Sequence, residues 1–173
     1  MAELTERHIK ETDIDWYCLV KGSPTHIASM GGMIPKSFRD REKLRTLQDA
    51  VAQIEPFAEI RLNLEGIQSQ IEKGYEYLQD ETIRRALEEV NAKNSGFMYL
   101  EGQALAIRLF ASTFVEKARR GFRSFARREG ADGNEYILIA EPATPVEYKP
   151  GVLQLAELEC EIRDKSGSIV LSV

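Results

Sequence analysis

The residues of this chain that most readily suggest chemistry are seven basic side chains between positions 108 and 128. Only one acidic residue, Glu116, lies among them, so the stretch has a formal charge of +6, whereas the whole chain of 173 residues has −5 and the remainder therefore −11. Guanidinium groups bind carboxylates and phosphates through paired hydrogen bonds. The pattern indicates either a surface for an anionic partner or a helix that docks on acidic groups of its own chain. The basic residues are Arg108, Lys117, Arg119, Arg120, Arg123, Arg127 and Arg128.

The spacing within this stretch predicts an amphipathic helix over residues 113–129. Thr113 and Glu116 form a capping box at its start, and Gly130 is the expected stop. Phenylalanines fall on one side of the helical wheel, where they would pack on a sheet, and arginines fall on the other. We expect this arginine face to dock an acidic protein surface or a second copy of the chain, and nucleic acid is less favoured because the chain as a whole is acidic. The arginines are Arg119, Arg120, Arg123 and Arg127.

Three glutamates offer an alternative, internal partner for the arginines. Glu157, Glu159 and Glu161 alternate with apolar residues in an expected strand, so their carboxylates lie on one face. They contact either water or the arginines. If carboxylates of the same chain neutralise the arginines, the hypothesis of an external partner loses its basis. We expect no metal site here, because one strand face does not converge enough oxygen atoms on an ion.

A second candidate site is a glycine loop that precedes an expected helix. Gly31 and Gly32, followed by Lys36 and Ser37, would present backbone N–H groups and a cation to a phosphate or carboxylate. The loop departs from the Walker A pattern, which has a glycine where Pro35 stands, and a proline offers no N–H. We therefore expect no nucleotide binding, but a small anionic ligand at this loop remains the alternative function.

His26 is the candidate acid or base of an enzyme. It stands three residues before Ser29, and Asp13 or Asp15 is the candidate orienting group. Positions three apart on a strand face opposite sides, and no nucleophile motif surrounds the serine, so a structural histidine is the favoured interpretation. The sequence favours a non-enzymatic protein without a cofactor, and a small enzyme that uses His26 on an anionic substrate is the competing hypothesis.

Apolar periodicity and turn residues predict the elements that must position these groups. Strands are expected at residues 14–20, 25–30, 58–64, 97–101, 104–111, 136–140, 152–163 and 168–173. Helices are expected at residues 38–54, with Ser37 as the capping residue, at two segments within 67–90, and at 113–129. A single helix from residue 102 to 128 is the rival interpretation of the last of these.

These elements predict an α+β fold with an antiparallel or mixed sheet of about six to eight strands packed against about four helices. We expect one domain over residues 1–173, in which 141–151 is an exposed proline-rich connection to a C-terminal hairpin at 152–173. The chain has no apolar run of membrane-spanning length and no signal-peptide pattern, so a cytoplasmic location is expected. Cys18 and Cys160 are expected to be reduced core thiols.

Overall fold

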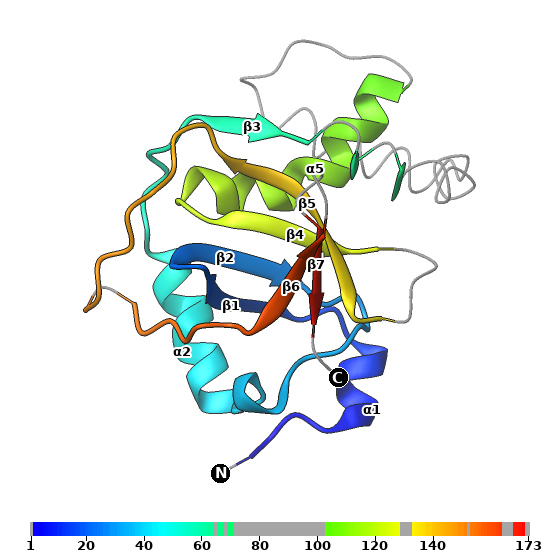
Figure 1. The fold of residues 1–173 in the computed structure, drawn as a ribbon, viewed down its shortest axis with the longest axis vertical. Helices are drawn as coiled ribbons and strands as arrows, with labels where there is room; N and C mark the ends of the chain where they lie inside the picture. The colour runs from blue at the N-terminus through cyan, green and yellow to red at the C-terminus, as the bar shows by residue number, and fades with distance from the viewer. Residues whose placement is uncertain are drawn as a thin grey trace.

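The computed structural model describes residues 2–63, 66–67, 69–70, 103–128, 133–151, 153–163 and 168–171. Within these ranges a mixed sheet of seven strands curls around a core, and three α-helices have defined bounds (Figure 1). The α+β class and the strand number agree with the expectation, but about four helices were expected. The helices are α1 (Glu6–Glu11), α2 (Arg41–Ala52) and α5 (Gln103–Arg119), with a 3-10 helix η1 (Lys36–Phe38). The strands are β1 (Asp15–Val20), β2 (Ser23–Ala28), β3 (Ile60–Leu62), β4 (Arg123–Arg127), β5 (Glu135–Pro142), β6 (Cys160–Arg163) and β7 (Ser168–Leu171).

The strand order is β1-β2-β4-β5-β7-β6, and β3 pairs with β5 beside this path. Only the β2–β4 pairing is parallel among the described strands. The chain just before β6 also reaches the far edge, where the Leu19 N–H donates to the Ala156 carbonyl at 2.8 Å and the Leu158 N–H donates to the Leu19 carbonyl at 2.7 Å. The sheet therefore curls into a half-barrel.

The N-terminal hairpin is confirmed, with a tighter turn than expected. Lys21 and Gly22 both have positive φ, 48° and 76°, as a two-residue hairpin turn with the right twist requires. Pro24 already belongs to β2, opposite Leu19. This position suits proline, because it lies at the start of the strand.

Helix α2 begins later than predicted. Asp40 is its capping residue and accepts a hydrogen bond of 3.0 Å from the Lys43 N–H. The prediction that Ser37 caps the helix is wrong, because Ser37 lies within η1. The expected strand at 58–64 is shorter, since only Ile60–Leu62 pairs with β5.

The predicted helix at residues 113–129 is wrong. Helix α5 runs through Thr113 and ends at Arg119, where Gly121 adopts a φ of 99° and the chain turns into β4. Apolar contacts on both sides explain why 123–127 becomes a strand: Phe125 joins one core and Ala126 the other. The capping box was misleading because Thr113 also fits a helix interior. The rival interpretation, a single helix from residue 102 to 128, agrees better with the structure at its start, because α5 begins at Gln103.

Several other expectations fall partly or wholly outside the described residues. The predicted strand at 104–111 is wrong, since these residues belong to α5, whereas 97–101 is not described. Of the two helices predicted within 67–90, only Ile67, Ser69 and Gln70 are described, and they are helical. The C-terminal hairpin is confirmed as β6 and β7, with strand structure from Cys160 onward. The expected connection at 141–151 begins later, because β5 continues through Pro142.

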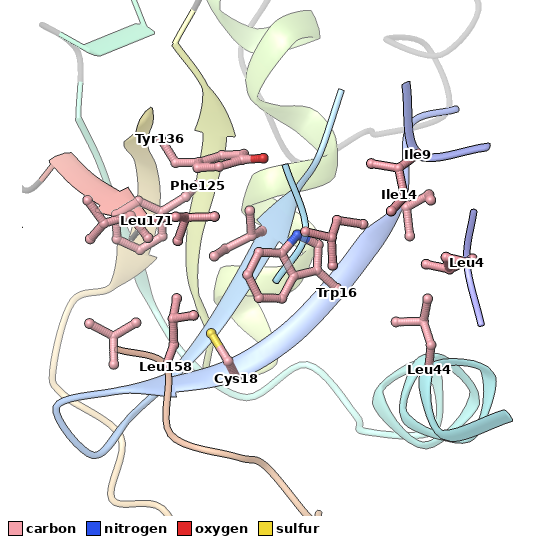
Figure 2. Close-up of a cluster of buried hydrophobic side chains, with 14 of the residues drawn as sticks. Leu4, Ile9, Ile14, Trp16, Cys18, Leu44, Phe125, Tyr136, Leu158 and Leu171 are labelled. Carbon is pink, nitrogen blue, oxygen red and sulfur yellow. The ribbon is translucent and has the colours of Figure 1, made fainter. Parts of the chain in front are cut away.

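The described hydrophobic residues form three clusters. The first fills the inside of the curl and includes Trp16, Cys18, Phe125 and Tyr136 (Figure 2). Cys160 packs against it, and both cysteines are free thiols. The second cluster lies between the sheet and α5, and the third joins α2 to the sheet. The first strands are thus fixed against helices on their outer side and a core on their inner side.

Candidate functional site

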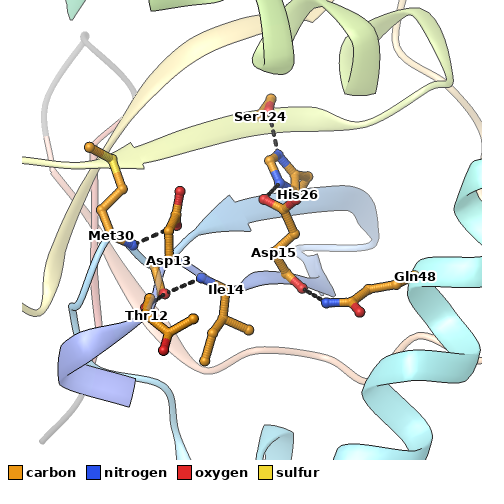
Figure 3. A network of polar contacts seen from close by, with 9 residues as sticks. Thr12, Asp13, Ile14, Asp15, His26, Met30, Gln48 and Ser124 are labelled. Carbon is orange, nitrogen blue, oxygen red and sulfur yellow. Dashed lines mark hydrogen bonds and ion pairs between the residues drawn. The ribbon is translucent and has the colours of Figure 1, made fainter. Parts of the chain in front are cut away.

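A chain of three polar side chains crosses the first three strands of the sheet (Figure 3). His26 on β2 is fully buried; its Nε2 lies 2.8 Å from Oδ1 of Asp15 on β1, and its Nδ1 lies 2.5 Å from Oγ of Ser124 on β4. A neutral ring that is protonated at Nε2 satisfies both contacts, because it donates to the carboxylate and accepts from the hydroxyl. His26 therefore fixes the position of the Asp15 carboxylate.

Ser124, His26 and Asp15 resemble the three residues of a catalytic serine, histidine and aspartate triad, but their geometry does not permit nucleophilic catalysis by the serine. Ser124 is completely buried, so no substrate reaches its hydroxyl. The candidate Ser29 is also buried and lies elsewhere, where its hydroxyl accepts a 2.8 Å hydrogen bond from the Ile14 N–H. Asp13 accepts from the Met30 N–H at 2.8 Å instead of orienting His26. Of the predicted set, the structure brings together only His26 and Asp15.

Burial and hydrogen bonding set the charge states of this pair. Burial lowers the pKa of His26 more strongly than Asp15 raises it, so the ring stays neutral near pH 7. Burial by itself would raise the pKa of Asp15, but the hydrogen bond from His26 and nearby positive charge, including that of Lys117, outweigh it and the pKa is lowered. Asp15 thus carries a negative charge at a position fixed by the core.

The Asp15 carboxylate reaches a polar cavity of about 610 Å³. The cavity lies where α1, the start of β1, α2 and α5 meet, and Gln48 of α2 anchors one wall by donating to the Asp15 carbonyl at 2.8 Å. Its charged lining comes from segments far apart in the sequence. These charged residues are Asp13, Asp15, Arg41, Arg45 and Lys117.

The three cations of this cavity form no ion pair within the described ranges. Arg41 and Arg45 stand four residues apart on α2, so they lie on one face of the helix. Lys117 approaches from α5 and belongs to the basic stretch that the sequence singled out. Asp13 and Asp15 line the same cavity, but its cations outnumber these carboxylates by one, and this excess of positive charge favours an anionic ligand.

The arginines expected to form a docking face are instead dispersed. Arg119 ends α5, Arg120 lies in the turn, and Arg123 and Arg127 stand at the two ends of β4. Groups of the same chain satisfy several arginines of the basic stretch. These contacts are Arg120 with Glu116 at 3.0 Å, Arg123 with Glu141 at 3.2 Å, Arg128 with Glu135 at 3.5 Å, and Arg127 with the Met30 carbonyl at 3.1 Å.

The internal partners proposed from the sequence have other contacts. Glu157 accepts a hydrogen bond of 3.3 Å from the Gly22 N–H, and Glu161 pairs with Arg163 of its own strand at 3.6 Å. The basic stretch is therefore neutralised in part by its own chain, but through carboxylates on α5 and β5 that the sequence did not indicate.

The glycine loop packs tightly inside the protein. The Gly32 N–H donates to the Ser29 carbonyl at 2.6 Å, and the Met33 N–H donates to the Gly133 carbonyl at 2.8 Å. These two N–H groups are occupied and do not face a ligand. Lys36 and Ser37 follow in η1 with exposed side chains. Neither lines the cavity that holds Asp15.

Another cavity, of about 760 Å³, lies between the turn after α5 and residues 144–149. Its floor is apolar, with Phe122, Leu153 and Leu155, and Phe57 at its mouth is 63% exposed. Arg120 lines it but already donates to the Ile54 carbonyl at 3.0 Å. Its charged lining is mixed, with Glu59, Glu147 and Lys149 beside Arg120, and it contains fewer cations than the first cavity.

Comparison of the chain with protein-family models, with curated proteins and with solved structures found no match. In the part of the chain that the structure describes, no three histidine, cysteine, aspartate or glutamate side chains cluster closely enough to hold a metal ion. No described helix combines the length and apolar character needed to cross a membrane.

Proposed function

We propose that this protein is a non-enzymatic binding protein for an anionic group, which it holds in the cavity lined by Arg41, Arg45 and Lys117. One observation supports the proposal above the others: these three cations line a single polar cavity and form no ion pair with any described residue. A carboxylate or phosphate between them would relieve their repulsion and accept charge-assisted hydrogen bonds.

The proposal keeps the anionic partner suggested by the basic stretch and changes its location. Lys117 takes the place of the dispersed arginines, and α2 supplies the other two cations. The cavity volume of about 610 Å³ is in the range of small-molecule sites, so a small anion fits the concave shape better than a broad acidic surface does. An acidic side chain of a partner protein has the same chemistry, so the experiment must separate the two sources.

Absence of catalysis is part of the proposal. The only serine in contact with His26 among the described residues is buried, and the Asp15 carboxylate is held by the imidazole in a fixed orientation. The arrangement suits a preformed binding wall more than a proton transfer to substrate.

Isothermal titration calorimetry with inorganic phosphate and, separately, with a short glutamate-rich peptide tests the proposal. We expect binding that weakens as salt is raised, and a loss of about tenfold in affinity for each of Arg45→Gln and Lys117→Gln. Arg163→Gln removes an exposed arginine outside the cavity and is the matched control. Tighter binding of phosphate indicates a small ligand, and tighter binding of the peptide indicates a protein partner. If neither probe binds, or if the cavity variants bind as the control does, the proposal is wrong.

A further inference from the structure

We infer that the ligand of this cavity is a zwitterion, with an ammonium group that contacts Asp13 and Asp15 and an anionic group that contacts the cations of α2 and α5. The inference rests on the proposed function, because it assigns the anionic end of the ligand to the same cations. Its independent basis is the pair of carboxylates that line the same cavity.

The two aspartates are placed for a common contact. Asp15 is the first residue of β1 and Asp13 lies two residues before it, and both side chains line the same cavity. Each is held by one contact: Asp13 accepts from the Met30 N–H, and Asp15 accepts from Nε2 of His26, at 2.8 Å in both cases (Figure 3). Two fixed carboxylates form a suitable site for an ammonium group, whose three N–H bonds need several acceptors.

The opposite charges of the cavity interact through space, since Lys117 helps to lower the pKa of Asp15, but none of the ion pairs between described residues joins them. Within the described ranges, neither Asp13 nor Asp15 pairs with a lysine or an arginine, although Arg41, Arg45 and Lys117 line the same space. A molecule that carries both charges would complement this mixed lining.

The charge balance supports a ligand with little net charge. Two carboxylates and three cations leave the lining with a net charge of only about +1 when the lining histidine His8 is neutral. A simple anion would satisfy the cations but would lie near the two aspartates, which repel it. A positive group on the same ligand turns that repulsion into attraction.

Calorimetry with matched pairs of probes tests the inference. The probes are ethyl, propyl and butyl phosphate and the corresponding aminoalkyl phosphates, which add only a terminal ammonium group. We expect at least one aminoalkyl phosphate to bind about tenfold more tightly than its alkyl partner. The variants Asp13→Asn and Asp15→Asn keep a carbonyl acceptor for Met30 and His26, and we expect them to abolish the gain without weakening the binding of the alkyl phosphate.

The outcomes distinguish the inference from the proposed function. Equal affinity of both probe series for the wild type, or a gain that persists in the two asparagine variants, would overturn the zwitterion while the anion site stands. Failure of both series to bind would overturn the anion site itself. Circular dichroism at increasing temperature verifies that each variant is folded, and Asp49→Asn, at an exposed position of α2, serves as a variant outside the cavity lining.

Discussion

Nε2 of His26 and Oδ1 of Asp15 lie 2.8 Å apart on neighbouring strands, and this contact joins the buried core to the candidate site. The imidazole has no exposure to solvent, whereas about a third of the Asp15 side chain is exposed. A carboxylate on a flexible edge would move freely, but this one is anchored by a ring that cannot move without disturbing the sheet. The stability of the fold and the geometry of the cavity therefore depend on the same hydrogen bond.

Replacement of His26 tests this dependence. We expect His26→Gln to lower the free energy of unfolding at pH 7 by about 1–3 kcal/mol, because the buried Ser124 hydroxyl and Asp15 lose well-placed partners. Urea unfolding followed by circular dichroism measures the change. His8→Gln is the matched control, since His8 is exposed on α1, and it should stay within about 0.5 kcal/mol of the wild type. Equal stability of the two variants would contradict the role of His26.

The same residue predicts a pH dependence of stability. Burial lowers the pKa of His26 in the folded protein, so the unfolded chain takes up the proton at a higher pH. The stability that neutral His26 contributes is present above about pH 6.5 and declines as the pH falls below that value. We expect the wild type to lose more stability than His26→Gln between pH 7 and pH 5. The lowered pKa of Asp15 acts only below about pH 4, outside this window. Parallel stability curves for the two proteins would refute the prediction.

The start of α2 provides a test of the capping assignment. Asp40→Ala removes the acceptor of the Lys43 N–H, and we expect a loss of about 1 kcal/mol in the free energy of unfolding. Ser37→Ala should change stability by less than about 0.5 kcal/mol, because Ser37 is exposed within η1. The comparison uses chemical unfolding of both variants. A larger effect of Ser37→Ala would show that the helix begins where the sequence pattern placed it.

The local parts of the fold were predictable from the sequence. The hairpin of β1 and β2 depends on Lys21 and Gly22, so its signal lies in contiguous residues, and β6 and β7 pair as neighbours in the sequence. The segment at 123–127 was not predictable in the same way. Its two arginines and Phe125 fit a helical wheel, but pairing with β2 and β5 on both sides makes it a central strand.

The candidate site was only partly predictable, for a related reason. His26, Asp15 and Lys117 attracted attention because of their residue types, whereas Arg41 and Arg45 resembled an ordinary solvated helix face. The cavity forms only when α2 and α5 pack near the start of β1, and no local sequence pattern predicts that packing. Ser124 was also missed, because a serine between an arginine and a phenylalanine gives no signal of its own.

Gly32 tests the packing of the glycine loop. A Cβ atom at this position would lie 2.5 Å from Oη of Tyr136, 2.8 Å from the Gly133 carbonyl oxygen and 2.9 Å from the Ser29 carbonyl oxygen. We expect Gly32→Ala to cost about 1–3 kcal/mol of stability, because two of these atoms belong to the backbone and cannot move aside cheaply. Gly22→Asn is the control, since its turn is open and asparagine tolerates positive φ. Thermal unfolding of both variants decides the matter, and a fully stable Gly32→Ala protein would mean that the loop is looser than described.

A substitution of Arg127 tests whether this arginine stabilises the fold or serves only to dock a partner. Its guanidinium donates to the Met30 carbonyl at 3.1 Å and packs over Gly133, where a Cβ atom would lie 3.5 Å from Nη2. Arg127→Ser should therefore reduce the free energy of unfolding by about 1 kcal/mol, since one hydrogen bond and the packing over the glycine are lost. Arg163→Ser on the exposed strand β6 should stay within about 0.5 kcal/mol of the wild type. An arginine that served only to bind a partner would leave the stability of the isolated protein unchanged, so equal unfolding curves for Arg127→Ser and wild type would return Arg127 to the set of docking residues.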